Sequence, residues 1–295
     1  PLLMQKEGLD ARVMDLFRLQ SKQTCDLEEW KEFLSRLKNP TDEVTIGLVG
    51  KYVELKDAYK SIAEAFIHAG AKNACKVNLK WIQSETINHD NASNILNKLD
   101  GVLVAPGFGE RGVEGKIAAI RYVREHGIPF FGICLGMQCA VVEFARNVLK
   151  YEKAASTELY PHTPHPVIDM MAEQKAITIK GGTMRLGAYE CDIKAGTLAH
   201  KAYESTKISE RHRHRYEFNN KYINEFEAAG MQVSGVNPDG GLVEVVELKD
   251  HPWFVGAQFH PELKSTVLKP HPLFVGFINA AIEYSKHKVS NSIEV

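Results

Sequence analysis

After Pro40, short apolar runs rich in β-branched residues alternate with stretches whose apolar residues recur at helical spacing. This alternation is typical of a doubly wound α/β fold, because parallel strands need crossover connections that are usually helices. The expected strands are Val44–Val49, Val77–Ile82, Gly101–Ala105, Ile128–Ile133, Leu242–Leu248 and Phe254–Phe259. The expected helices are Ala58–Ala71, Val113–Glu125 and Gln138–Val148. We therefore predict an α/β domain with a mostly parallel sheet flanked by helices.

Residues 1–40 differ from the remainder of the chain. They are rich in charge, their apolar residues have helical spacing, and the pattern ends at Asn39-Pro40. Two interpretations fit equally: the end of a preceding domain with its linker, as a first residue other than Met suggests, or a self-contained N-terminal helix. We expect residues 41–285 to form one domain, a length that single domains reach, and residues 286–295 to be a polar tail.

The composition excludes several classes of function. A formal net charge of −1 and a pI near 7.0 create no long-range field, so we expect neither nucleic acid nor a membrane as a partner. The five cysteines are scattered without CxxC spacing, which favours a reducing, cytoplasmic setting and predicts no metal site. No apolar run approaches the roughly 18 to 20 residues that span a bilayer, and no signal peptide is recognisable.

Gly132-Ile133-Cys134-Leu135-Gly136 has the form of a nucleophile elbow, placed where a buried strand turns into a helix. The glycines permit the tight turn, and the helix N-terminus beside the sulfur favours the thiolate, which is the attacking species. An isolated cysteine after a strand is more often a small core residue. The flanking glycines favour the nucleophile.

Phe259-His260-Pro261-Glu262 follows the last expected strand and offers an acid–base pair. Residues two apart at a strand end point the same way, so Glu262 can accept from one ring nitrogen of His260 while the other faces the sulfur. Taken alone, the tripeptide would more often contain a structural or surface histidine. Its combination with the elbow predicts a Cys134–His260–Glu262 triad.

The loop Ala105-Pro106-Gly107-Phe108-Gly109 directly follows a strand, at the sheet edge where doubly wound folds bind ligands. Attack on a carboxamide builds negative charge on oxygen, and the N–H groups of Gly107 and Leu135 are candidates to stabilise it. A plain strand-to-helix turn is the alternative. The cationic run from Arg211 to Arg215 is short and lacks interleaved aromatics, so we expect a solvated or interface-facing loop, one arginine of which can bind a carboxylate.

These motifs together resemble the class I glutamine amidotransferase family, over roughly residues 44–280. The elbow and HPE are typical of the whole class, whereas PGFGERGVEGK, STE, GGTMRLG, ERHRHRYE and HPWFVGAQFHPE resemble its CTP synthase branch. The resemblance implies a flavodoxin-like fold in which Cys134 attacks the glutamine amide and forms a γ-glutamyl thioester. One departure is visible: the family reads Pro-Gly-Gly-Phe-Gly where this chain has Ala-Pro-Gly-Phe-Gly, and Pro106 donates no hydrogen bond.

The resemblance also implies the residues that hold glutamine and the partners of the domain. The residues implied to surround glutamine are Gly107, Phe108, Leu135, Gly136, Met137 and Gln138, with Glu158 and Arg215 fixing its amino-acid end. Residues 1–40 would then end a synthetase domain that aminates UTP to CTP with ATP and Mg, stimulated by GTP, in a homo-oligomeric enzyme. No cofactor is expected in the glutaminase domain itself, and no Gly-x-x-x-x-Gly-Lys-Ser/Thr loop occurs.

Two rival classes remain open at this point. A stand-alone cysteine hydrolase of the same fold, such as a γ-glutamyl hydrolase, would keep Cys134, His260 and Glu262 without needing the arginine-rich segment. A regulatory or filament-forming module would keep the fold and lose the triad, and the intact triad argues against it.

Overall fold

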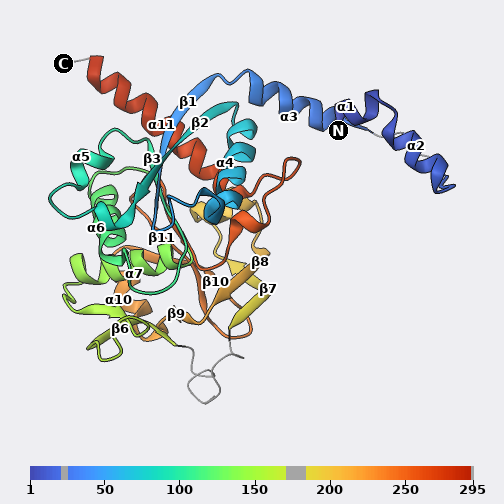
Figure 1. Cartoon of the computed structure of the whole chain (residues 1–295). Coiled ribbons are helices and arrows are strands. Elements are labelled where there is room, and N and C mark those ends of the chain that lie inside the picture. Colours follow the sequence, from blue (N-terminus) through green and yellow to red (C-terminus); the bar gives the residue numbers. More distant parts are fainter. Residues whose placement is uncertain (21–25, 171–183, 294–295) are drawn as a thin grey trace.

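The computed structural model describes residues 1–20, 26–170 and 184–293. Its centre is a nine-stranded sheet in the order β2-β1-β3-β4-β12-β11-β10-β7-β8 (Figure 1). The strands are β1 (Asp42–Gly50), β2 (Cys75–Gln83), β3 (Gly101–Val104), β4 (Phe130–Ile133), β7 (Arg185–Ile193), β8 (Lys207–His214), β10 (Met231–Val236), β11 (Val243–Leu248) and β12 (Phe254–Ala257). The pairings from β2 to β12 are parallel and those from β12 to β8 are antiparallel.

Helices cover both faces of this sheet. The α-helices of the domain are α4 (Lys60–Lys72), α5 (Ala92–Leu96), α6 (Val113–Glu125), α7 (Leu135–Asn147), α9 (Leu198–Tyr203), α10 (Ile223–Ala228) and α11 (Pro272–Ile293). One apolar cluster joins α4, α9 and α11 to the sheet, and a second joins α5, α6, α7 and α10 to it. Short 3-10 turns are η1 (Lys56–Tyr59), η2 (Ser84–Thr86), η3 (Asn220–Tyr222) and η4 (Pro261–Leu263). The central strands β1, β3, β4, β11 and β12 are therefore buried on both faces, which explains their continuous apolar sequences.

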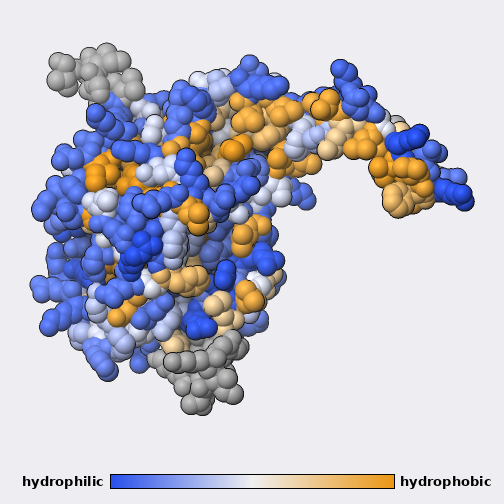
Figure 2. All heavy atoms as spheres, viewed as in Figure 1, coloured by the Kyte–Doolittle hydropathy of each residue, from blue (hydrophilic) through white to orange (hydrophobic). Residues whose placement is uncertain are grey.

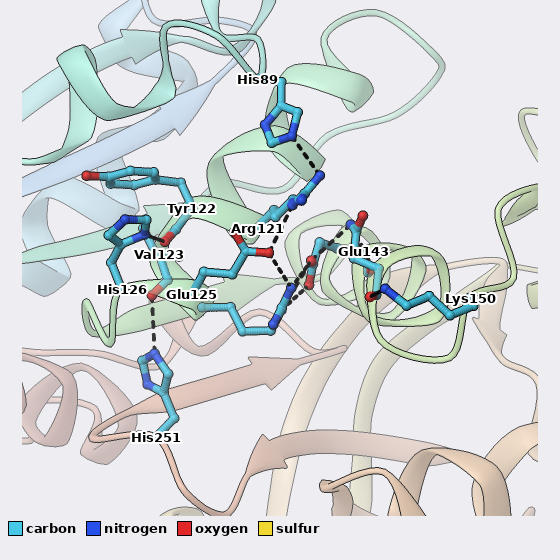
Figure 3. Close-up of polar contacts among 11 residues, drawn as sticks. His89, Arg121, Tyr122, Val123, Glu125, His126, Glu143, Lys150 and His251 are labelled. Atoms are coloured by element: carbon cyan, nitrogen blue, oxygen red, sulfur yellow. Dashed lines mark hydrogen bonds and ion pairs between the residues drawn. The ribbon is translucent and has the colours of Figure 1, made fainter.

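Two neighbouring helices on one face, α6 and α7, are tied by charged side chains. Arg124 of α6 donates three hydrogen bonds of 2.8 to 3.1 Å to Glu143 of α7, whose side chain is fully buried. Figure 3 shows the contacts around this pair, which reach His89 through Glu125 and Arg121. Breaking a buried pair of this kind typically costs about 3 to 5 kcal/mol, so the pair contributes to holding α6 against α7.

A separate three-stranded sheet consists of β5 (Ala154–Ser156), β6 (His165–Met170) and β9 (Tyr216–Phe218), in the order β5-β6-β9. β9 follows β8 after a single residue, Arg215, so the chain passes from the large sheet into the small one at that point. The small sheet thereby brings the turn after β5 close to the end of β8.

The N-terminal segment contains α1 (Leu2–Lys6), α2 (Leu9–Leu16) and α3 (Glu28–Lys38). α3 lies against α4, whereas neither α1 nor α2 has a buried residue. Apolar side chains gather on this arm (Figure 2), and Leu16 and Phe17 are 70% and 71% exposed.

Most of the predicted elements are present, and the α/β class is confirmed. The sheet is mixed, because β11, β10, β7 and β8 extend the parallel half in antiparallel fashion. The expected polar tail is partly helical, since α11 continues to Ile293. The run from Arg211 to His214, expected as a loop, lies in β8. Within the described residues, no helix is long and apolar enough to cross a membrane.

Candidate active site

Cys134 occupies a sharp turn between β4 and α7. Its φ of 51° and ψ of −104° are unusual for a residue other than glycine, and such strain costs on the order of 1 to 3 kcal/mol. The backbone holds the turn from both sides: the Cys134 N–H donates to Ala257 of the neighbouring strand at 2.7 Å, and its carbonyl accepts from the Gln138 N–H at 3.1 Å. The turn therefore presents the thiol at the carboxyl end of the parallel strands, as the elbow pattern predicts.

The two elbow glycines are needed for close packing. A Cβ on Gly136 would lie 2.1 Å from the carbonyl oxygen of Val104, and one on Gly132 would lie 2.8 Å from the Gly136 carbonyl carbon. Both distances are far below van der Waals contact, so a side chain at either position would push α7 away from the sheet. The glycines thus set how closely the helix that follows Cys134 approaches β3.

His260 and Glu262 reach the thiol because β12 pairs in parallel with β4. Nδ1 of His260 lies 2.7 Å from Oε1 of Glu262, and both side chains are buried. The second ring nitrogen, Nε2, is buried and has no hydrogen-bond partner within normal limits among the described residues. The Cys134 thiol nevertheless interacts with the imidazole and shifts its pKa. The three side chains therefore form the predicted sequence of thiol, imidazole and carboxylate.

The electrostatics of this group favour a charged imidazole. Burial by itself lowers the pKa of His260, but the hydrogen bonds and charges of Cys134 and Glu262 outweigh burial and raise that pKa to about 10. At neutral pH the ring is therefore an imidazolium beside the sulfur. A pair of this kind can deliver a proton to a leaving group while the sulfur attacks.

A cavity of about 440 Å³ opens in front of the thiol. Its lining combines the elbow, the loop after β3, the turn after β5 and the end of β8. The lining residues are Gly107, Phe108, Cys134, Gln138, Glu158, Met184, Arg213, His214, Arg215 and Tyr216. The cavity therefore brings together five of the eight residues expected around glutamine. It is large enough for one amino acid.

Glu158 and Arg215, the two charged residues expected at the amino-acid end, both line this cavity. Both charges also act on the hydroxyl of Tyr216, since Glu158 raises and Arg215 lowers its pKa, after burial as the largest cause. No helix begins at Glu158, which lies in the turn after β5, so it does not serve as a helix cap. A positive and a negative side chain thus share the polar end of the cavity.

The remaining expected contacts lie in the first turn of α7. Gln138 lines the cavity and donates from Nε2 to the Tyr216 carbonyl at 2.9 Å. Met137 is fully buried against Gly256, and neither Met137 nor Gly136 lines the cavity. Leu135 lies beside the loop, because a Cβ on Gly107 would be 3.6 Å from its Cδ2. The two candidate oxyanion donors, Gly107 and Leu135, are therefore neighbours.

A second cavity of about 310 Å³ meets the first at the thiol. It shares Cys134, Gly107, Phe108 and Arg213 with the first cavity, and its lining also includes Tyr52 and His260. The guanidinium of Arg213 lies 5.8 Å from the centre of the Phe108 ring, within range of a cation–π contact. The sulfur is therefore reached from two sides.

The arginine-rich run was expected as a loop, and this prediction is wrong. In β8 the side chains alternate, so that His212 and His214 are buried while Arg211 and Arg213 are exposed. The register of β8 with β7 places Arg185 opposite His214. Every second side chain of β8 is buried, as in a strand with one buried face, although here the buried residues are titratable.

Those histidines belong to a buried cluster of titratable side chains, which borders the cavity through His214. Arg185 donates to Glu244 at 2.5 Å and lies 3.5 Å from Glu217, and Nδ1 of His212 lies 2.8 Å from Nε2 of His214. Burial lowers the pKa of His212 to about 2 and that of His214 to about 3, so both rings are neutral. His212, His214 and Glu244 each offer one atom that could bind a metal ion, and these atoms lie within 4.8 Å of one another. Because Arg185 already pairs with Glu244, we interpret the cluster as an ion-pair network. Residues 181–183 of the GGTMRLG motif lie outside the described residues.

Sequence reasoning missed two polar residues of the site. Gln258 places Nε2 3.8 Å from the Cys134 sulfur and accepts from Gln138 at 3.2 Å. Its signal was available, since Gln258 precedes His260 by two residues and shares its face. Lys51 is buried at the end of β1 and donates to the Gly109 carbonyl at 3.3 Å. No local pattern distinguishes this lysine from a surface one.

Comparison with known proteins identifies the family. The model of the class I glutamine amidotransferases matches residues 54–280. A CTP synthase of Cytophaga hutchinsonii is 63% identical over 98% of this chain and 53% of its own length, and one of Bacteroides fragilis is 55% identical over 96% and 53%. The chain thus spans about half the length of the curated relatives it matches.

A solved structure is similar to this fold over nearly the whole length of the solved chain. The glutaminase domain of Trypanosoma brucei CTPS, solved with bound acivicin, is 36% identical to this chain, with a TM-score of 0.77. The match covers 81% of this chain and 94% of that one. The chain therefore belongs to the class I glutamine amidotransferase family.

Proposed function

We propose that this chain hydrolyses glutamine to glutamate and ammonia, with Cys134 as nucleophile, His260 as acid and base, and Glu262 as the group that orients the imidazole. The observation that carries the proposal is the strained turn at Cys134, which presents the thiol to a buried imidazole–carboxylate pair at the mouth of an amino-acid-sized cavity. The family membership of residues 54–280 supports the same chemistry.

The proposed reaction has two steps, formation of a thioester with loss of ammonia and hydrolysis of that thioester, and together they return the triad to its starting protonation state. The thiolate of Cys134 adds to the side-chain carbonyl of glutamine, and the N–H groups of Gly107 and Leu135 stabilise the negative oxygen. The imidazolium of His260 then gives its proton to the departing nitrogen, which leaves as ammonia. The neutral ring next takes a proton from water, and the hydroxide adds to the γ-glutamyl thioester. The C–S bond then breaks to restore the Cys134 thiolate beside the imidazolium, and the new carboxylic acid gives its proton to the released ammonia, which leaves glutamate and ammonium.

The charges in the cavity give the substrate an orientation. We propose that the carboxylate of Glu158 binds the α-ammonium of glutamine and that the guanidinium of Arg215 binds its α-carboxylate. Phe108 and Gln138 then border the side chain, and the first turn of α7, from Leu135 through Gly136 and Met137, lies below it. A simple amide lacks both charges, so this arrangement discriminates against it.

We propose further that the ammonia serves a synthetase domain outside this chain. The curated relatives are about twice as long and are named CTP synthase, which supports amination of UTP to CTP as the use of the ammonia. Residues 1–40 would end that domain, and residues 41–285 would form the glutaminase. ATP and Mg would bind the synthetase, GTP would activate hydrolysis, and the whole enzyme would be a homo-oligomer.

The test compares substrates and a covalent probe. Purified chain should release ammonia from glutamine slowly, should release no glutamate from a γ-glutamyl peptide, and should form no CTP from UTP, ATP and ammonia. A glutamine analogue with a chloroketone in place of the amide should add one equivalent of mass at Cys134 and none in Cys134→Ala. Release of glutamate from the peptide, with glutamine left intact, would instead assign a γ-glutamyl hydrolase.

A further inference from the structure

Lys116 is a fully buried lysine that the proposed reaction does not use. It lies on α6, and its ammonium donates to the carbonyl of Ala105 at 2.6 Å. No carboxylate contributes to its electrostatic surroundings in the described part of the chain, where the titratable groups that act on it are Cys139, Lys51 and Cys134. The main-chain carbonyl of Ala105 is therefore the acceptor that accounts for its place.

Packing does not explain a lysine at this position. Burial lowers the pKa of Lys116 to about 8, and withdrawing an ammonium from water typically costs several kcal/mol. A methionine would fill a similar volume without that penalty. The reason for a lysine here must therefore lie in the hydrogen bond that its ammonium donates to the Ala105 carbonyl.

The helix that carries Lys116 is held in place on two sides. A Cβ on Gly115 would lie 1.7 Å from the carbonyl oxygen of Ser84, so this turn of α6 is in direct contact with η2. Arg146 of α7 pairs with Glu114 at 2.9 Å, in addition to the contacts of Arg124 described above. The ammonium therefore projects from a rigid support toward the loop after β3.

The carbonyl of Ala105 controls the direction of the next N–H. That carbonyl belongs to the planar peptide that joins Ala105 to Pro106, and Lys116 fixes the orientation of this plane. The ring of Pro106 fixes the following torsion near −65°. One torsion, ψ of Pro106, then remains to aim the N–H of Gly107. Beyond Gly107, Lys51 holds the carbonyl of Gly109 at 3.3 Å.

We propose that Lys116 is a positioning residue for glutamine hydrolysis, which fixes the Ala105–Pro106 peptide and thereby aims the Gly107 N–H at the oxygen of the reacting amide. The inference rests on the proposed glutaminase function and on Gly107 as an oxyanion donor. It assigns a role to the proline by which this loop departs from its family, since the proline and the lysine restrain one peptide together.

The expected effect follows from what an oxyanion donor contributes. Complete loss of one donor typically lowers the rate by about 10² to 10³, and a donor that is present but badly aimed should cost less. We expect Lys116→Met to lower kcat for glutamine by about 10- to 100-fold. KM should change by less than about twofold, because the residues proposed to bind the amino-acid end of glutamine are untouched.

The experiment measures three quantities in Lys116→Met, in Lys116→Arg and in Lys150→Met. Lys150 (Figure 3) is the matched control, because its ammonium also donates to a main-chain carbonyl, at 2.8 Å, but on the exposed end of α7. The quantities are kcat and KM for glutamine, the rate at which chloroacetamide alkylates Cys134, and the melting temperature. Alkylation forms no oxyanion, so its rate depends on the reactivity of the Cys134 thiol and not on the donors of the loop after β3.

The inference predicts that Lys116→Met loses kcat while alkylation stays within about threefold of the wild type, that Lys116→Arg recovers part of kcat, and that Lys150→Met changes nothing. Adding Pro106→Gly to Lys116→Met should cost more than the product of the two single effects. A kcat within threefold of the wild type, or alkylation that falls in parallel with kcat, would overturn the positioning role. Wild-type chain that releases no ammonia from glutamine would overturn the proposed function, and this inference with it.

Discussion

Gly136→Ala is the substitution whose effect the structure determines most directly. The added Cβ would lie 2.1 Å from the Val104 carbonyl oxygen, whereas ordinary contact begins at 3.4 Å, so α7 must withdraw from β3 by about 1.3 Å. The obstacle is backbone, which cannot rotate away as a side chain can. Overpacking of this kind typically costs about 1 to 3 kcal/mol of stability. The same withdrawal moves Cys134 and the Leu135 N–H, which begin that helix.

A displacement of about 1 Å at a reacting group can cost on the order of 10² in rate, so we expect kcat for glutamine to fall about 100-fold in Gly136→Ala. Ammonia release should be measured beside Gly240→Ala, where an added Cβ meets its nearest neighbour at 3.4 Å and should leave kcat unchanged. Chloroacetamide should also alkylate the variant more slowly, because the sulfur moves relative to His260. A Gly136→Ala protein that keeps kcat within threefold would refute the argument from close approach.

Three further predictions concern the site. Cys134→Ala should abolish ammonia release and His260→Ala should nearly do so, whereas Glu262→Ala should lose less, because an orienting carboxylate typically contributes less than the acid–base residue; equal losses would contradict that division. Glu158→Ala and Arg215→Ala should each raise KM for glutamine, at a cost of about 2 to 5 kcal/mol in binding, and an unchanged KM in both would place the substrate elsewhere. In NMR titrations the His260 ring should stay protonated up to about pH 9 in the wild type, since its raised pKa preserves the charge until pH passes about 10, and should titrate at lower pH in Cys134→Ala.

The strongest local patterns predicted the parallel strands and the sharp turn at Cys134. The apolar runs at β1, β3 and β4 are buried on both faces, and this burial makes them continuous in sequence. The flanking glycines of Cys134 mark a turn that few other structures require. The pairing of β12 with β4 brings His260 to the sulfur, and no periodicity encodes it, because strand order depends on long-range packing.

The antiparallel half of the sheet was harder to predict because its buried face is charged. β8 presents His212 and His214 to the interior, whereas a short cationic run without interleaved aromatics favours a solvated or interface-facing loop. Titratable residues are rarely buried. The burial of these two histidines depends on Arg185 and Glu244, which lie on other strands. The alternation of arginine and histidine in β8 is visible in the sequence, but the residues on other strands that stabilise the buried histidines are not. The burial of Lys116 is equally hidden in the sequence, since its acceptor is the main-chain carbonyl of Ala105 and no residue pattern marks it.

The buried cluster around Glu244 should make the stability of the domain depend on pH. Burial raises the pKa of Glu244 to about 7 from 4.5, although Arg185 opposes this shift, and burial also raises the pKa of Glu217 well above its usual range. An acid whose pKa is raised by folding binds its proton more tightly in the folded state. Its contribution is therefore fully favourable below pH 4.5 and is lost as pH rises to about 7. For Glu244 the shift corresponds to about 3 kcal/mol.

Glu244→Gln removes this titration while keeping the shape of the side chain. The free energy of unfolding of the wild type, minus that of the variant, should therefore fall by about 3 kcal/mol between pH 4.5 and pH 8, measured by urea denaturation. In Glu244→Gln, the guanidinium of Arg185 keeps the carboxyl group of Glu217 as a neighbour at 3.5 Å. If the difference between wild type and Glu244→Gln is the same at both pH values, Glu244 is ionised throughout and the cluster is a fixed ion pair.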